Sequence, residues 1–235
     1  MRGGIIVTVC ALAIAACDNA SNAPASRPAP TTTAVPAPAV VPDTPPPSGY
    51  DESLFTKVPA GTLAGQILDF ERRPARDVVV YVKKGPARAK PAARSPAVVD
   101  QKNKTFMPRV LPIVVGTRVE FKNSDPVLHN VYSRADVKKF DLGMFSKSET
   151  KSVAFDTVGR IDVFCSIHTN MHVVILVLAN DQFATSDASG FFAIPDLQPG
   201  TYTLAIWDEV ASEREVTVEV AADKPAILKH QLVKE

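Results

Sequence analysis

The sequence predicts an all-β protein on three observations. From residue 50 onward, short apolar or alternating runs are bounded by Gly, Pro, Asn and Asp, and no stretch repeats its apolar residues with a helical period. Residues 78–82 form a continuous apolar run typical of a buried strand. Residues 118–122 and 161–165 alternate between apolar and polar side chains, as strands with one buried face do.

Residues 1–17 have the pattern of a secretory signal peptide. Arg2 supplies a positive charge near the start, residues 5–16 form an apolar run, and small residues precede Cys17. The run is too short to span a bilayer as a stop-transfer helix. We therefore expect this leader to direct export and to be cleaved before Cys17, so that Cys10 is removed with it.

Residues 18–49 form a Pro/Ala-rich segment with almost no large apolar side chains. It contains nine of the 20 prolines of the chain. Such a composition cannot bury enough apolar surface to fold, so we predict a disordered linker.

The rest of the chain alternates between strands and polar loops. The strand at 78–82 precedes a loop rich in Lys, Arg, Pro and Ala at 83–96. The strands at 118–122 and 161–165 follow, and residues 215–220 form another alternating strand. Many short strands separated by turn residues favour a β-sandwich architecture.

Composition excludes several classes of function. With 26 Lys and Arg against 25 Asp and Glu, the net charge of +1 provides no basic surface for nucleic acid. The sequence lacks the glycine-rich phosphate-binding motifs, the zinc-protease motif and the serine-hydrolase motif. We predict a protein that is not an enzyme.

The segment 165–171 places a thiol, an imidazole and a thioether within seven residues. The alternation of residues 161–165 turns the Cys165 thiol inward at the end of a strand, beneath an apolar shell. The following loop then returns His168 and Met171 to the same point, and His129 comes from a distant strand. Two His, one Cys and a weak axial Met form the ligand set of blue-copper electron-transfer sites. We predict one copper ion per chain.

Three other features bear on this interpretation. Cys165 would be the free thiol of an exported protein, where unpaired cysteines oxidise, and metal binding would explain its presence. The alternative is a buried structural cysteine. His172 could compete as a ligand, although we favour an exposed loop histidine that faces away from the metal. His230 is expected to be solvated.

The ligand order and its surroundings resemble the cupredoxin family. The resemblance covers residues 95–179, and the Cys-x₂-His-x₂-Met spacing matches amicyanin more closely than plastocyanin or pseudoazurin. The residues that carry it are Phe106, Pro108, the segment 115–125 and the run His129, Asn130, Val131. It implies a Greek-key β-sandwich with His129, Cys165, His168 and Met171 as copper ligands. It also implies that Asn130 and Ser166 form a hydrogen-bonded latch between the ligand loops.

A second resemblance concerns the segment 185–204. Its Asp-x-x-Gly turn and Pro-Gly-x-Tyr strand entry are similar to those of the carboxypeptidase regulatory-like, or transthyretin-like, β-sandwich. We predict that 60–88 and 180–235 form one discontinuous sandwich of this kind, into which the cupredoxin is inserted. The alternative is that 60–88 adds a strand to the cupredoxin and 180–235 is an appendage. This family is usually non-catalytic, which implies a positioning role.

Residues 14–17 resemble a bacterial lipobox, which implies that Cys17 is lipidated and anchors the protein to a membrane. Asp18 resembles an inner-membrane retention signal. The combined resemblances imply an amicyanin-like periplasmic one-electron carrier, whose redox partner is a c-type cytochrome or a periplasmic dehydrogenase docking near His168. Two alternatives remain: a copper-binding or trafficking lipoprotein without redox turnover, and a structural envelope lipoprotein with a cupredoxin scaffold. The absence of His-x-His pairs argues against a multicopper oxidase.

Overall fold

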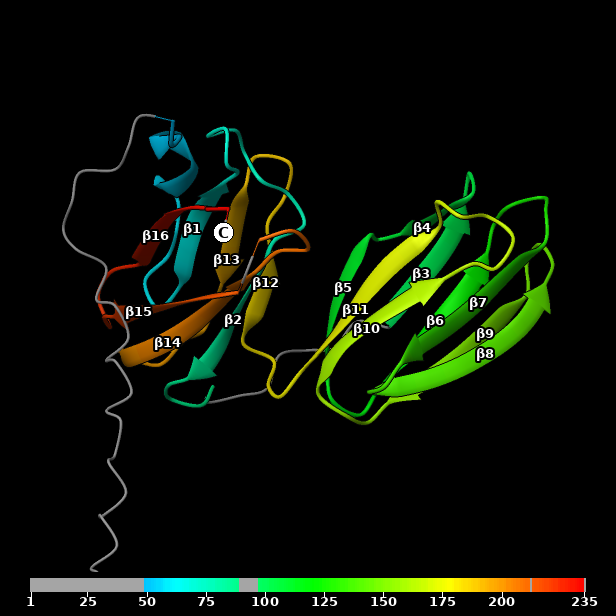
Figure 1. Ribbon diagram of the computed structural model, residues 1–235. Coiled ribbons are helices and arrows are strands. Elements are labelled where there is room, and N and C mark those ends of the chain that lie inside the picture. The colour runs from blue at the N-terminus through cyan, green and yellow to red at the C-terminus, as the bar shows by residue number, and fades with distance from the viewer. Residues whose placement is uncertain (1–48, 89–96, 212, 235) are drawn as a thin grey trace, which may run out of the picture. The chain divides into compact units, whose positions relative to one another are not determined.

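The computed structural model describes residues 49–88, 97–211 and 213–234, and the predicted all-β class is confirmed (Figure 1). The one helix among these residues is a 3-10 turn, η1 (Glu52–Phe55), which Asp51 caps by accepting a hydrogen bond from the Ser53 N–H at 2.9 Å. In these ranges no helix combines the length and apolar character needed to cross a bilayer. The predicted leader, the lipidation site Cys17 and nearly all of the linker lie outside the described residues.

The strands between Ala97 and Leu178 form two sheets. The first has the order β4-β3-β6-β9, from β3 (Ala97–Lys102), β4 (Thr105–Met107), β6 (Thr117–Asn123) and β9 (Thr150–Phe155). The second has the order β5-β11-β10-β7-β8, from β5 (Val110–Val114), β7 (His129–Ala135), β8 (Lys138–Phe145), β10 (Gly159–Phe164) and β11 (His172–Leu178). One buried apolar cluster draws side chains from both sheets, so they pack as a sandwich.

The predicted alternation decides which side chains fill this core. In β6, Val119 and Phe121 are buried, while Arg118, Glu120 and Lys122 face solvent. In β10, Ile161 and Val163 are fully buried, and Cys165 directly after the strand continues the same face. The period of two therefore brings the thiol to the end of the core, as the sequence predicts.

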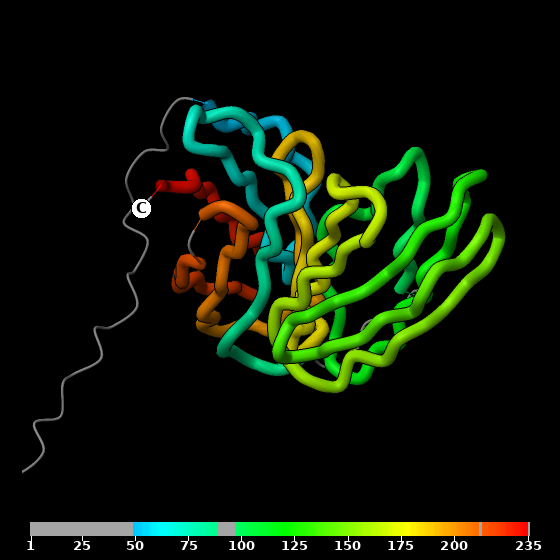
Figure 2. The backbone as a smooth tube through the Cα atoms, turned by 45° about the vertical axis from the view of Figure 1, so that its right-hand side comes forward, coloured from blue at the N-terminus to red at the C-terminus, as the bar shows by residue number. Residues whose placement is uncertain are grey.

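The remaining strands form two further sheets, in which the two ends of the described chain meet. One has the order β13-β1-β16, from β1 (Leu63–Leu68), β13 (Phe191–Ile194) and β16 (Ala226–Gln231). The other has the order β12-β2-β14-β15, from β2 (Val79–Lys84), β12 (Phe183–Thr185), β14 (Gly200–Trp207) and β15 (Arg214–Val220). β1 pairs in parallel with β16, and Figure 2 shows the cyan N-terminal strands beside the orange and red C-terminal ones. Their inward side chains form a second core cluster.

Trp207 in β14 is buried. It is 8% exposed and belongs to a small apolar cluster with Val79, Val110, Val174 and Leu176. The guanidinium of Arg160 lies 5.6 Å from the centre of a Trp207 ring, which adds a cation–π contact.

We expect Gly65→Ala to destabilise the β13-β1-β16 sheet. A Cβ at Gly65 would lie 2.2 Å from the Leu228 carbonyl oxygen of β16 and 2.5 Å from Cε1 of the Phe192 ring. Because the nearest atom is backbone of a paired strand, the crowding should lower the free energy of unfolding by about 2–3 kcal/mol. Urea unfolding of Gly116→Ala is the control, since that Cβ would meet nothing within 4 Å and only its positive φ would cost energy. A Gly65→Ala loss no larger than the control's would contradict this explanation.

His230, expected to be solvated, is partly buried in β16, and its Nε2 has no hydrogen-bond partner among the described residues. Burial lowers the pKa of His230, and the positive charge of Arg214 lowers it further. The unfolded imidazole, with a pKa near 6.5, therefore takes up a proton that the folded one resists, so stability should fall as the pH drops below about 6.5. We predict that His230→Gln weakens this fall, measured as the urea midpoint at several pH values between 7.5 and 5. If His230→Gln left the pH dependence unchanged, the loss of stability at low pH would come from other groups.

Candidate metal centre

Three of the predicted ligands meet at one end of the sheet β5-β11-β10-β7-β8. His129 is the first residue of β7, and Cys165 directly follows β10, its antiparallel neighbour. The nitrogen Nδ1 of His129 lies 3.1 Å from Nδ1 of His168, and Sγ of Cys165 lies 3.7 Å from the same His168 atom. All three ligand atoms lie within 4.8 Å of one another.

The loop between β10 and β11 closes on itself by backbone hydrogen bonds. The N–H of Met171 donates to the His168 carbonyl at 3.0 Å, and the N–H of Cys165 donates to the Met171 carbonyl at 3.3 Å. This closure brings the second histidine back beside the thiol. Met171 is fully buried and packs in the same core cluster as Cys165.

Asp125 fixes the orientation of His129. Its Oδ2 lies 2.8 Å from Nε2 of the fully buried His129, so the other ring nitrogen, Nδ1, faces Cys165 and His168. Asp125 also accepts hydrogen bonds from the N–H groups of Asn103 at 2.6 Å and Lys104 at 2.7 Å. Burial alone would raise the pKa of Asp125, but these hydrogen bonds and the one to His129 outweigh burial and lower it. A carboxylate behind a metal-binding imidazole is the usual support of such a ligand.

The donor set fits a thiophilic metal ion. Nitrogen ligands bind at about 2.0 Å and thiolate sulfur at about 2.3 Å, which at angles of 110–120° places them roughly 3.3–3.8 Å apart. The separations of 3.1 and 3.7 Å are close to this spacing. Burial lowers the pKa of His168, and the nearby His129 lowers it further, which favours the neutral imidazole that binds metals. These residues could hold one copper ion.

His172 is engaged elsewhere. The sequence favoured an exposed loop histidine, but His172 begins β11 and is partly buried. Its Nε2 lies 2.8 Å from Asp162, its Nδ1 lies 3.3 Å from Glu209, and its ring stacks on Phe164 with centroids 4.7 Å apart. Because both ring nitrogens face carboxylates, His172 does not compete with Met171 for a metal.

The expected latch between Asn130 and Ser166 is not a direct hydrogen bond. Asn130 is 4% exposed, and its Nδ2 donates to Asp141 at 2.7 Å. Its Oδ1 is buried and has no partner in the described part of the chain. Asn130 and Ser166 line the same cavity.

Sequence reasoning missed Asp125 as part of the site. The residue lies four positions before His129, but the intervening loop after β6 carries no period that predicts a side-chain contact. An acidic residue shortly before the first ligand histidine is the only signal that could have indicated it.

Comparison with known proteins gives structural neighbours only. No protein family matches the chain, and no curated protein does. A mutant of amicyanin in its reduced Cu(I) form is 25% identical with a TM-score of 0.34, covering 42% of this chain and 98% of its own. A purple cupredoxin from Nitrosopumilus maritimus is 22% identical with a TM-score of 0.33, covering 35% of this chain and 99% of its own. A copper-containing nitrite reductase from Thermus scotoductus SA-01 is 28% identical with a TM-score of 0.34 and covers 40% of this chain.

This chain matches 27% of the nitrite reductase. Each similarity spans less than half of the present chain, so the assignment of the site rests on its own residues.

Proposed function

We propose that the protein is a mononuclear copper protein that carries single electrons and has no enzymatic activity of its own. The observation that supports this most is the meeting of one thiol and two imidazole nitrogens within 4.8 Å at the end of an apolar core. Copper bound by such donors supplies a one-electron couple. A rigid β-scaffold suits this role because it limits movement between the two oxidation states.

Each residue of such a site has a separate role. Cys165 would supply a soft thiolate donor, and the buried Met171 would be a weaker sulfur donor. Asp125 holds His129 in one orientation, and the closed loop returns His168 to the site. His129, Cys165 and Met171 are buried while His168 is partly exposed, so we infer that electrons leave near His168. The neighbouring side chains of Leu128 and Ile167 are 51% and 53% exposed, which suits a protein partner.

The cellular setting belongs to the same proposal. A lipid anchor on Cys17, left after cleavage of the leader, and a Pro-rich linker would tether the copper domain to the periplasmic face of the inner membrane. A c-type cytochrome or a periplasmic dehydrogenase would then be within reach as redox partner. Globomycin treatment, which blocks lipoprotein signal cleavage, should leave a larger precursor in cells.

The test of the central function is a copper titration of the purified protein. We expect one equivalent of Cu(II) to produce an intense thiolate-to-copper absorption band, together with a reversible one-electron wave in voltammetry. A tightly bound ion with no reversible wave would favour copper trafficking instead. A protein that remains colourless with copper in both oxidation states would contradict the proposal.

A further inference from the structure

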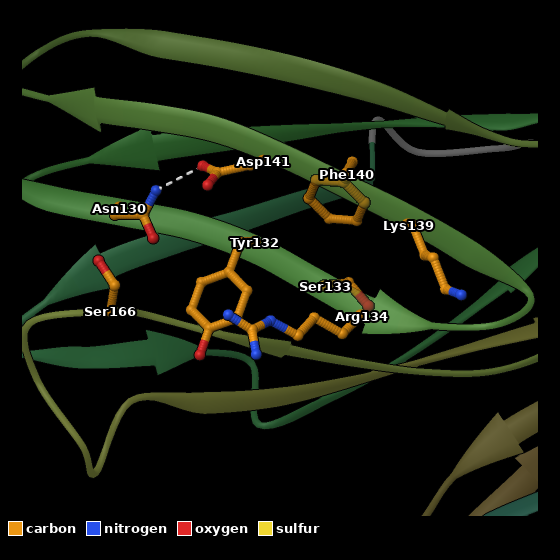
Figure 3. Close-up of a pocket in the computed structure, with 8 residues that line it drawn as sticks. All are labelled: Asn130, Tyr132, Ser133, Arg134, Lys139, Phe140, Asp141 and Ser166. Carbon is orange, nitrogen blue, oxygen red and sulfur yellow. Dashed lines mark hydrogen bonds between the residues drawn. The ribbon is translucent and has the colours of Figure 1, made fainter.

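Beside the candidate metal centre, residues of β7 and β8 line a cavity of about 580 Å³. Asn130, Tyr132, Asp141 and Ser166 are among its lining residues (Figure 3). Asn130 directly follows His129, and Ser166 directly follows Cys165. The cavity therefore touches both segments that supply candidate ligands.

A β-bulge places Asp141 within reach of Asn130. Asn130 pairs with Met144 and Tyr132 pairs with Asp141, so two steps along β7 correspond to three along β8. The extra residue is accommodated at Gly143, whose φ is +65°. As a result Phe145 stays buried beside the core, while Asp141 stays on the outer face.

The contacts of Asp141 determine how the Asn130 amide is oriented. Its Oδ1 accepts hydrogen bonds from Nδ2 of Asn130 at 2.7 Å and from the N–H of Gly143 at 2.8 Å. An ionised carboxylate has no proton to donate, so only the nitrogen end of the amide can face it. In Figure 3 the Asn130 amide nitrogen points at Asp141, and its oxygen lies on the side of Ser166.

We propose that Asp141 is a positioning residue for the metal centre: by binding the Asn130 amide nitrogen it keeps the amide oxygen turned toward the segment that contains Cys165 and Ser166. This inference rests on the proposed copper function. The Asn130 oxygen is buried and has no hydrogen-bond partner among the described residues, which costs free energy and calls for an explanation. Because it faces the segment that contains Cys165 and Ser166, we infer that it is held ready to accept a hydrogen bond from the loop that supplies the thiolate.

The decisive variants are Asp141→Ala, Asp141→Asn and Asp136→Ala. Asp141→Ala removes the acceptor at an exposed position, whereas an amide oxygen in Asp141→Asn can accept the same two N–H groups. Asp136→Ala is the matched control, because it removes the same charge from the same β7–β8 hairpin. There Asp136 pairs with Lys139 at 2.7 Å. We expect Asp141→Ala to raise the copper dissociation constant about 10- to 100-fold, the usual cost of losing a supporting residue. Asp141→Asn should recover most of the affinity, and Asp136→Ala should match wild type.

Hydrogen exchange in the metal-free protein provides the second measurement. Asp141→Ala should accelerate main-chain exchange around Asn130 and Ser166, while Asp136→Ala should not. If the wild-type protein bound no copper but this exchange effect appeared, the copper function would fail and the positioning role would stand. If copper bound normally and Asp141→Ala equalled Asp136→Ala in both measurements, the inference would be overturned.

Discussion

Replacing Cys165 with serine should abolish the thiolate-to-copper band and weaken copper binding by at least about 100-fold, since losing even a supporting residue costs 10- to 100-fold. The physical reason is that Cys165 is the one thiol among the described residues and supplies the soft donor of the site. A serine hydroxyl is harder and far less acidic, so it cannot form the same bond with copper. Optical titration with Cu(II) and competition with a chelator measure the two effects.

Stability must be separated from metal binding in this experiment. Cys165 is 5% exposed within an apolar cluster, so an unpaired serine hydroxyl there should cost about 1–3 kcal/mol. Cys165→Ala is the control, because it removes the thiol without burying a hydroxyl. Both variants should lose the band even where their unfolding midpoints differ. A band that persists in either one would show that the chromophore does not involve Cys165.

Replacing Asp125 with alanine should have the second-largest effect, because this carboxylate links a hairpin turn to the candidate centre. Asn103 and Lys104 connect β3 to β4 with φ values of +55° and +54°, as a two-residue type I′ turn requires. Asp125 accepts the N–H groups of both residues and a bond from His129. Leaving these donors without an acceptor should lower the free energy of unfolding by about 3 kcal/mol. Copper affinity should fall about 10- to 100-fold, because His129 loses its support.

Asp187→Ala controls for the structural part of this effect. In the other sandwich, Asp187 likewise accepts two backbone N–H groups, from Ser189 at 2.8 Å and Phe191 at 3.1 Å, but no imidazole. It should destabilise the protein and leave copper affinity at the wild-type value. If the two variants changed affinity equally, the role of Asp125 would be structural only.

Local patterns were sufficient to predict the β-class and the burial of the thiol. The alternation of residues 161–165 involves only neighbours in the chain, and it correctly predicted that Cys165 faces the core. The short spacing from Cys165 to His168 allowed their meeting to be predicted in the same way. The copper ligation itself stays a prediction, as does the kinship of the second sandwich.

The supporting contacts could not be predicted, because they depend on pairing between strands. Asp141 reaches Asn130 only because β8 contains a bulge, and a sequence does not show where the register shifts. Glu209 meets His172 from 37 positions along the chain. The partial burial of His230 likewise depends on what packs over β16. The polar residues of that strand give no sign of this packing.

We propose that one copper ion binds between His129, Cys165 and His168. Crystals of the copper-loaded protein, measured with X-rays on either side of the copper absorption edge, test it most directly. We expect a single anomalous peak per chain, in contact with Sγ of Cys165 and with Nδ1 of both histidines. A peak at another position, or none at these three atoms in protein that has taken up copper, would contradict it.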